Sequence, residues 1–118
     1  MARQIKRIDY DSDNDIFSVS NGDVVKTSID VGDFILDVSS DNLICGLEIM
    51  DASENIGISK EVLGNVKSMK MSVHYGTNHV NVLLMVTFKK DDKEVNIPIP
   101  LTLNLGHKTP RREVLVYN

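Results

Sequence analysis

The chain lacks several features that would assign a protein to a class at once. Among its 118 residues are one cysteine, no tryptophan, three tyrosines and three phenylalanines. The single cysteine, Cys45, excludes an internal disulfide and suits a reducing compartment. No apolar run approaches the roughly 18 residues that cross a bilayer, and no apolar stretch follows the basic N-terminus as in a signal peptide. We therefore expect a cytoplasmic protein with an aliphatic, β-branched core.

Positive charge is also scarce. Thirteen lysines and arginines stand against 17 acidic residues, which gives a net charge of −4. A general surface for nucleic-acid phosphates is therefore disfavoured. The one basic cluster, Lys108 with Arg111 and Arg112, is short, and we interpret it as a solvated loop before a last strand at 114–117. We expect no nucleic acid and no membrane as a partner.

The chain does contain many short apolar segments separated by turn residues, which is typical of antiparallel sheets. A hydrophobic content of 42% and a charged content of 25% fit a single β-rich domain over residues 1–118. In the N-terminal part, strands are expected over 5–10, 16–20, 24–31, 34–38 and 43–50. The Asn21-Gly22 pair predicts a hairpin that sets Val19 opposite Val24.

The strongest pattern predicts a three-stranded meander in the C-terminal part, within 68–118. Apolar residues alternate over its strands, which are expected at 68–75, 79–88 and 94–103. Turns at Thr77-Asn78 and Asp91-Asp92 set Leu84 opposite Met71 on one side and Ile99 on the other.

A helix is expected in the connection 54–67. Ser59 is the predicted N-cap of a short helix over 59–66, which would pack on the sheet. The fold class is therefore mainly β, or α+β with one short helix.

Four apolar residues of the meander point away from its main core. The predicted register sets Leu83 across from Pro100 and Met85 across from Pro98. Prolines at these positions require 94–103 to be an edge strand, because they supply no N–H group for a further strand. Either the helix 59–66 covers these four residues, or they form a contact surface for another chain.

The acidic turn Asp11-x-Asp13-x-Asp15 resembles the opening of a calcium-binding loop. An EF-hand loop starting at Asp11 would need glycine where Ile16 stands and glutamate where Gly22 stands, so that motif is excluded. Two alternatives remain: a weak cation site, or a turn whose carboxylates accept hydrogen bonds from nearby backbone N–H groups.

Two further groups of polar residues could carry chemistry. A four-residue loop at 39–42 would set Asp33 opposite Glu48, which is unfavourable unless the carboxylates are solvated, paired or bridged by a metal. A solvated face is the favoured interpretation for the whole acidic set, which comprises Asp30, Asp33, Asp37, Glu48 and Asp51. His74 and His79 flank one turn and could begin a zinc site, but no third ligand is apparent, and exposed histidines are favoured.

Two motifs in the N-terminal part carry a family resemblance. One is Tyr10-Asp11 with Asp15 four residues on, and the other is the stretch 46–53, Gly-Leu-Glu-Ile-Met-Asp-Ala-Ser. Over residues 5–53 the chain resembles the small prokaryotic domain-of-unknown-function 2283 family, whereas 54–118 resembles no family that we can name. The resemblance implies a β-rich fold and a prokaryotic origin, and it transfers no active site.

Three functional classes follow, in order of preference. The first is a non-catalytic protein-interaction or self-associating β module that uses Leu83, Met85, Pro98 and Pro100 to bind another protein or a second copy. An antitoxin-like partner would be one form of it. The second is a domain that binds a divalent cation or small ligand at residues 11–15. An enzyme is third, because the sequence has no phosphate-cradling glycine loop and no nucleophile elbow. No cofactor is expected.

Overall fold

The computed structural model describes residues 2–104, which form two antiparallel sheets. Four strands follow the order β1-β7-β8-β9, and five follow the order β2-β3-β6-β5-β4. The strands are β1 (Ala2–Gln4), β2 (Arg7–Asp11), β3 (Ile16–Ser20), β4 (Val25–Val31), β5 (Phe34–Ser39), β6 (Ile44–Ile49), β7 (Val66–Tyr75), β8 (His79–Lys90) and β9 (Lys93–Asn104). The helices are α1 (Ala52–Ile56) and α2 (Lys60–Leu63). The predicted mainly-β class is confirmed.

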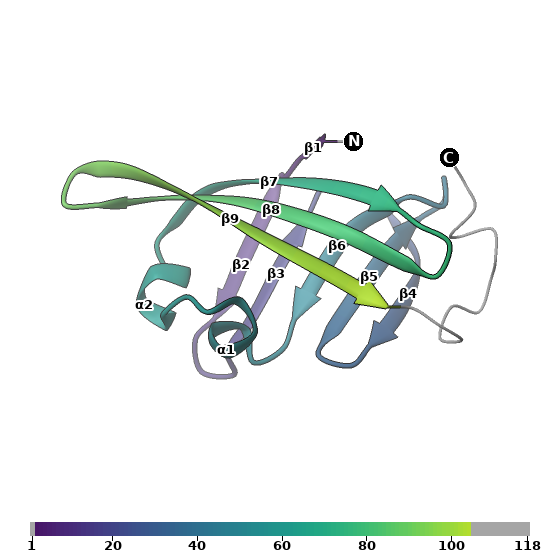
Figure 1. Cartoon of the computed structure of the whole chain (residues 1–118), viewed down its shortest axis with the longest axis horizontal. Coiled ribbons are helices and arrows are strands. Elements are labelled where there is room, and N and C mark those ends of the chain that lie inside the picture. The colour runs from purple at the N-terminus through teal and green to yellow at the C-terminus, as the bar shows by residue number, and fades with distance from the viewer. Residues whose placement is uncertain (1, 105–118) are drawn as a thin grey trace.

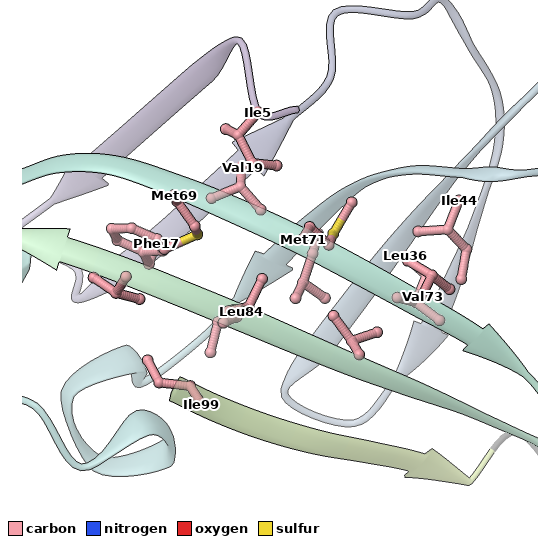
Figure 2. Close-up of a cluster of buried hydrophobic side chains, with 14 of the residues drawn as sticks. Ile5, Phe17, Val19, Leu36, Ile44, Met69, Met71, Val73, Leu84 and Ile99 are labelled. Atoms are coloured by element: carbon pink, nitrogen blue, oxygen red, sulfur yellow. The ribbon is translucent and has the colours of Figure 1, made fainter. Parts of the chain in front are cut away.

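The four-stranded sheet lies over one face of the five-stranded sheet, and its strands run across those beneath (Figure 1). Alternate residues of both sheets meet in between as one buried apolar cluster. Figure 2 shows Phe17 of the five-stranded sheet near Met69 of the other sheet, and Leu36 near Val73. This core is aliphatic and rich in β-branched residues, as the composition predicts.

The predicted meander is confirmed in its strands and its register. Leu84 pairs with Met71 on β7 and with Ile99 on β9. Asp91 and Asp92 both have positive φ, at 52° and 62°, as a two-residue turn of this hairpin requires. A fourth strand, β1, was not predicted, and it pairs with β7 on the side away from β8.

The predicted hairpin at Asn21-Gly22 is wrong. Val19 pairs with Ile8 on β2 and with Leu47 on β6, so both sides of β3 are occupied and β4 lies at the far edge of the sheet. After β3, the backbone N–H of Asn21 still donates to the Cys45 carbonyl of β6 at 2.9 Å, and the hydroxyl of Ser20 accepts from the N–H of Gly22 at 3.0 Å. The loop therefore leaves the sheet instead of turning back along β3.

The hairpin of β5 and β6 forms, but its register differs from the prediction. Glu48 lies opposite Ile35, and Asp33 precedes the strand in the turn before Phe34. A register shift between Asp37 and Val38 accounts for part of the change. The expected opposition of Asp33 and Glu48 is therefore wrong.

The predicted helix at 59–66 is only partly present. Ser59 does cap α2, where its hydroxyl accepts from the N–H of Val62 at 3.3 Å, but the helix ends at Leu63. The other helix, α1, precedes the predicted helix at 59–66 and overlaps only the start of the predicted helical connection 54–67. No helix within residues 2–104 is long and apolar enough to cross a membrane. The predictions for 108–117 lie outside the described residues.

Candidate functional site

An apolar patch lies on the outer face of the four-stranded sheet. We call Leu83, Met85, Pro98 and Pro100 the outer-face patch. Leu83 pairs with Pro100 and Met85 with Pro98, as predicted. Leu83 and both prolines are exposed, and Met85 is half-buried.

No described helix covers the outer-face patch. The buried side chain of α2, that of Leu63, belongs to the core between the two sheets. Both helices lie at one end of the five-stranded sheet (Figure 1). The expectation that the helix at 59–66 covers this face is therefore wrong, and the patch remains open over the described residues.

The position of β9 explains why its prolines are tolerated. It is an edge strand of the four-stranded sheet, as predicted. The Asp91-Asp92 turn makes Lys90 and Lys93 a hydrogen-bonded pair, and the alternation places Pro98 and Pro100 at non-hydrogen-bonded positions. Their missing N–H groups therefore fall on the free edge, which blocks the addition of another strand.

Basic side chains border one end of the outer-face patch. A hollow of about 500 Å³ beside Met85 is lined by Lys67 and Lys70, with Glu94 on its far side. The neighbouring Thr87 hydroxyl donates to Asn96 at 2.6 Å, which orders this rim. The end is therefore polar and carries more positive than negative charge.

A second hollow, of about 400 Å³, adjoins the patch at Leu83 and Pro100. His74 and Asn81 line its polar side, and the hydroxyl of Thr102 donates to Asn81 at 2.9 Å. The outer face thus combines an apolar centre with polar ends, an arrangement typical of protein contact surfaces.

The acidic turn uses two of its three carboxylates for internal hydrogen bonds. The Asp11 carboxylate accepts from the backbone N–H groups of Asp13 and Asn14 at 3.0 and 3.1 Å, and from the Asn14 side chain at 2.8 Å. These bonds lower the pKa of Asp11, the Asn14 side chain contributing most. The turn therefore has the hydrogen-bonded form that was one of its two predicted alternatives.

Asp15 joins the turn to the start of α1. Its carboxylate accepts from the hydroxyl of Ser53 at 2.6 Å and from the hydroxyl of Tyr10 at 2.7 Å. It also accepts from the backbone N–H of Ser53, and its own carbonyl accepts from the N–H of Ala52 at 2.9 Å. Asp51, the N-cap residue of α1, makes no side-chain cap. Asp15 therefore caps the helix from a distant turn.

These contacts shift two pKa values in opposite directions. The Ser53 hydroxyl, followed by that of Tyr10, lowers the pKa of Asp15 by stabilising its charged form. Burial, followed by the hydrogen bond to Asp15, raises the pKa of Tyr10 to about 12. The trio is thus a structural link in which both hydroxyl groups donate to one charged carboxylate.

The remaining acidic and histidine residues that the sequence singled out do not meet in one site. Asp37 accepts from the hydroxyl of Ser28 at 2.8 Å, and Asp33 accepts from the side chain of Asn55 at 3.3 Å. The imidazole of His79 lies against Gly76, where any Cβ would collide with it. Within residues 2–104, no group of three or more His, Cys, Asp or Glu side chains could hold a metal.

Sequence reasoning missed the link from Asp15 to Ser53, although both residues lie in the motifs that carry the family resemblance. Gly46 in the second motif also has a structural role, because a Cβ there would lie 2.9 Å from the Asp37 carboxylate and 3.1 Å from the Val19 carbonyl. The motifs therefore specify packing and capping. The two motifs are far apart in the sequence, so local patterns could not predict that they are in contact.

Comparison with known proteins found two matches. Residues 7–53 match the family described as protein of unknown function (DUF2283). A protein from Methanosarcina mazei named putative hypoxanthine phosphoribosyltransferase is 30% identical over 93 residues, which is 78% of this chain and 76% of that protein. No solved structure matches the chain.

Proposed function

We propose that this chain, which belongs to one family with the Methanosarcina protein and whose residues 7–53 match the DUF2283 family of unknown function, is a non-catalytic protein-interaction module. Its contact surface is the outer-face patch. The partner binds by side-chain packing, because Pro98 and Pro100 deny it a regular ladder on the β9 edge.

The exposure of Leu83 carries this proposal. It is one of only three large hydrophobic residues that are exposed among the described residues, with 39% of its surface accessible. It lies beside Met85 and the two prolines, so the apolar area is continuous across β8 and β9. An apolar centre with a polar rim is the arrangement that buries well against another protein.

The charge around the patch indicates the chemistry of the partner. Lys67 and Lys70 border Met85, so a partner with an apolar centre and carboxylates at one end would complement it. A protein toxin held by an antitoxin-like chain is one form that such a partner could take.

The name of the Methanosarcina protein refers to transfer of a phosphoribosyl group to hypoxanthine. A glycine-rich loop that leads into a helix N-terminus is a common binding site for phosphate groups. The described part of the chain has no glycine-rich loop before a helix, and its helices have five and four residues. We therefore do not extend that activity to this chain.

The test is capture of a partner from the native host by the tagged full chain. We expect a partner that Leu83→Asp loses and that Val24→Asp retains, since Val24 is 84% exposed and directly precedes β4 of the other sheet. Lys70→Glu should weaken the capture, and added salt should weaken it further. Equal capture by all variants, or consumption of hypoxanthine with a phosphoribosyl donor, would contradict the proposal.

A further inference from the structure

The strand β4 is an edge of a different kind from β9. It is the last strand of the five-stranded sheet, and no described strand lies beyond it. Its seven residues contain no proline. Of the three large hydrophobic residues that are exposed within 2–104, Val25 begins β4 and Val24 directly precedes it, with 46% and 84% of their surfaces accessible. As far as the described residues extend, this edge is therefore open to another strand.

The turn after β4 fixes which backbone groups face that open edge. Gly32 and Asp33 form a two-residue connection between the paired residues Val31 and Phe34. Such a connection makes Val31 and Phe34 a hydrogen-bonded pair. Alternation then directs the backbone groups of Ser28 and Asp30 away from β5 and toward the free edge.

The side chains of β4 complement a second, antiparallel copy of the same strand. In the register centred on Ser28, Lys26 lies opposite Asp30 of the second copy, and the twofold axis repeats that pair. Val25 then lies next to Val31 of the second copy. Lys26 and Asp30 are exposed, so both are free to meet a partner. Opposite charges directly across a sheet are favourable, whereas like charges are not.

An irregularity at one end limits the ladder. The register of β4 against β5 shifts between Val25 and Thr27, so Lys26 has no residue opposite it on β5. Its amino group donates to Asn42 at 3.3 Å, in an exposed contact that it could exchange for another carboxylate or amide. The regular part of the ladder is therefore residues 27–31, and the long lysine side chain spans the remaining distance.

We infer that β4 is a self-pairing edge through which two copies of this chain join their five-stranded sheets into one continuous sheet. The contact is isologous, with a twofold axis at Ser28. It lies on the other sheet from the outer-face patch and does not rest on the function proposed for that patch. A single strand pair buries little area, so the dimer should be weak and form at high protein concentration.

Charge reversal tests the register. Sedimentation velocity over a range of concentrations should show a wild-type dimer. Lys26→Asp and Asp30→Lys should each raise its dissociation constant about tenfold, because each places two like-charged pairs in the interface. The double variant should recover wild-type affinity. An equimolar mixture of the two single variants should form a mixed dimer.

Two controls separate this contact from others. Lys70→Asp reverses a charge on the outer face of the other sheet and should leave the dimer unchanged, and so should Leu83→Asp. Thermal melts of every variant verify folding. A chain that stays monomeric at its highest attainable concentration, or a double variant as weak as the single ones, would overturn the inference. A dimer lost only in Leu83→Asp would overturn it too.

Discussion

Leu84 and Leu83 are neighbours in β8 whose side chains lie on opposite faces of the four-stranded sheet. Leu84 has no exposed surface, whereas Leu83 is 39% exposed. Leu84→Ala would leave a cavity between β7 and β9 and should lower the free energy of unfolding by about 2–5 kcal/mol. Leu83→Ala is the matched control and should cost less than about 1 kcal/mol. Chemical denaturation measures both. Equal losses would show that the assignment of faces is wrong.

The hydrogen bonds to Asp15 predict how the stability of the chain depends on pH in the acidic range. The pKa of Asp15 is lowered in the folded chain from its ordinary value of 3.8, so its contribution is present above that value. It is lost as the pH falls through the folded pKa. Asp15→Asn should lower the melting temperature at neutral pH. As the pH is lowered, the melting temperature of this variant should decrease less than that of the wild type.

Asp13→Asn is the control for that measurement. Asp13 is exposed in the same turn, and its carboxylate accepts none of the bonds described above. We expect its melting curve to follow the wild type at every pH. If both variants behaved alike, net charge would explain the effect better than the link to α1.

Tyr10 gives a prediction at the other end of the pH scale. Its pKa is raised from 10.0 to about 12, so the folded chain favours the neutral phenol. The resulting stabilisation is complete below pH 10 and is lost as the pH rises toward 12. Tyr10→Phe should remove a phenolate transition near pH 12 from the titration followed by ultraviolet absorbance. A Tyr10 titration near 10 would contradict the observed contact.

The acidic turn should bind calcium weakly or not at all. Asp11 and Asp15 already accept hydrogen bonds, and the turn has no bidentate glutamate of the kind a calcium loop uses. Millimolar Ca²⁺ should therefore leave the melting temperature unchanged. A rise of several degrees that disappears in Asp13→Asn would contradict this prediction.

The prolines of β9 should keep that edge from pairing. Replacing Pro98 and Pro100 together with threonine restores two N–H donors on the free edge. We expect the double variant to stay folded and to aggregate more readily than wild type by light scattering. Asn96→Thr, in a strand position that already has its N–H, is the control and should not aggregate. An unchanged size distribution would contradict the protective role.

The sequence predicted those parts of the fold that rest on local periodicity and short turns. The register of the meander followed from the Asp91-Asp92 turn, and the outer-face patch followed from that register. The order of the five-stranded sheet could not be predicted in this way. The local Asn21-Gly22 signal favours β4 as the neighbour of β3, whereas contacts between residues distant in sequence place β6 there. The link from Asp15 to Ser53 joins residues 38 positions apart, and the periodicity of the sequence cannot predict a contact over that separation.

The division of the core between the two sheets has a consequence for the modularity of this family. The region 7–53 supplies one sheet whose inner face includes Phe17, Leu36 and Leu47, all essentially without exposed surface. In this chain, the strands after residue 65 cover that face. A polypeptide that ended at Ser53 would expose this inner face to solvent, and another molecule would have to cover it. The region 7–53 is therefore one layer of a two-layer sandwich, and in this chain the four-stranded sheet supplies the second layer.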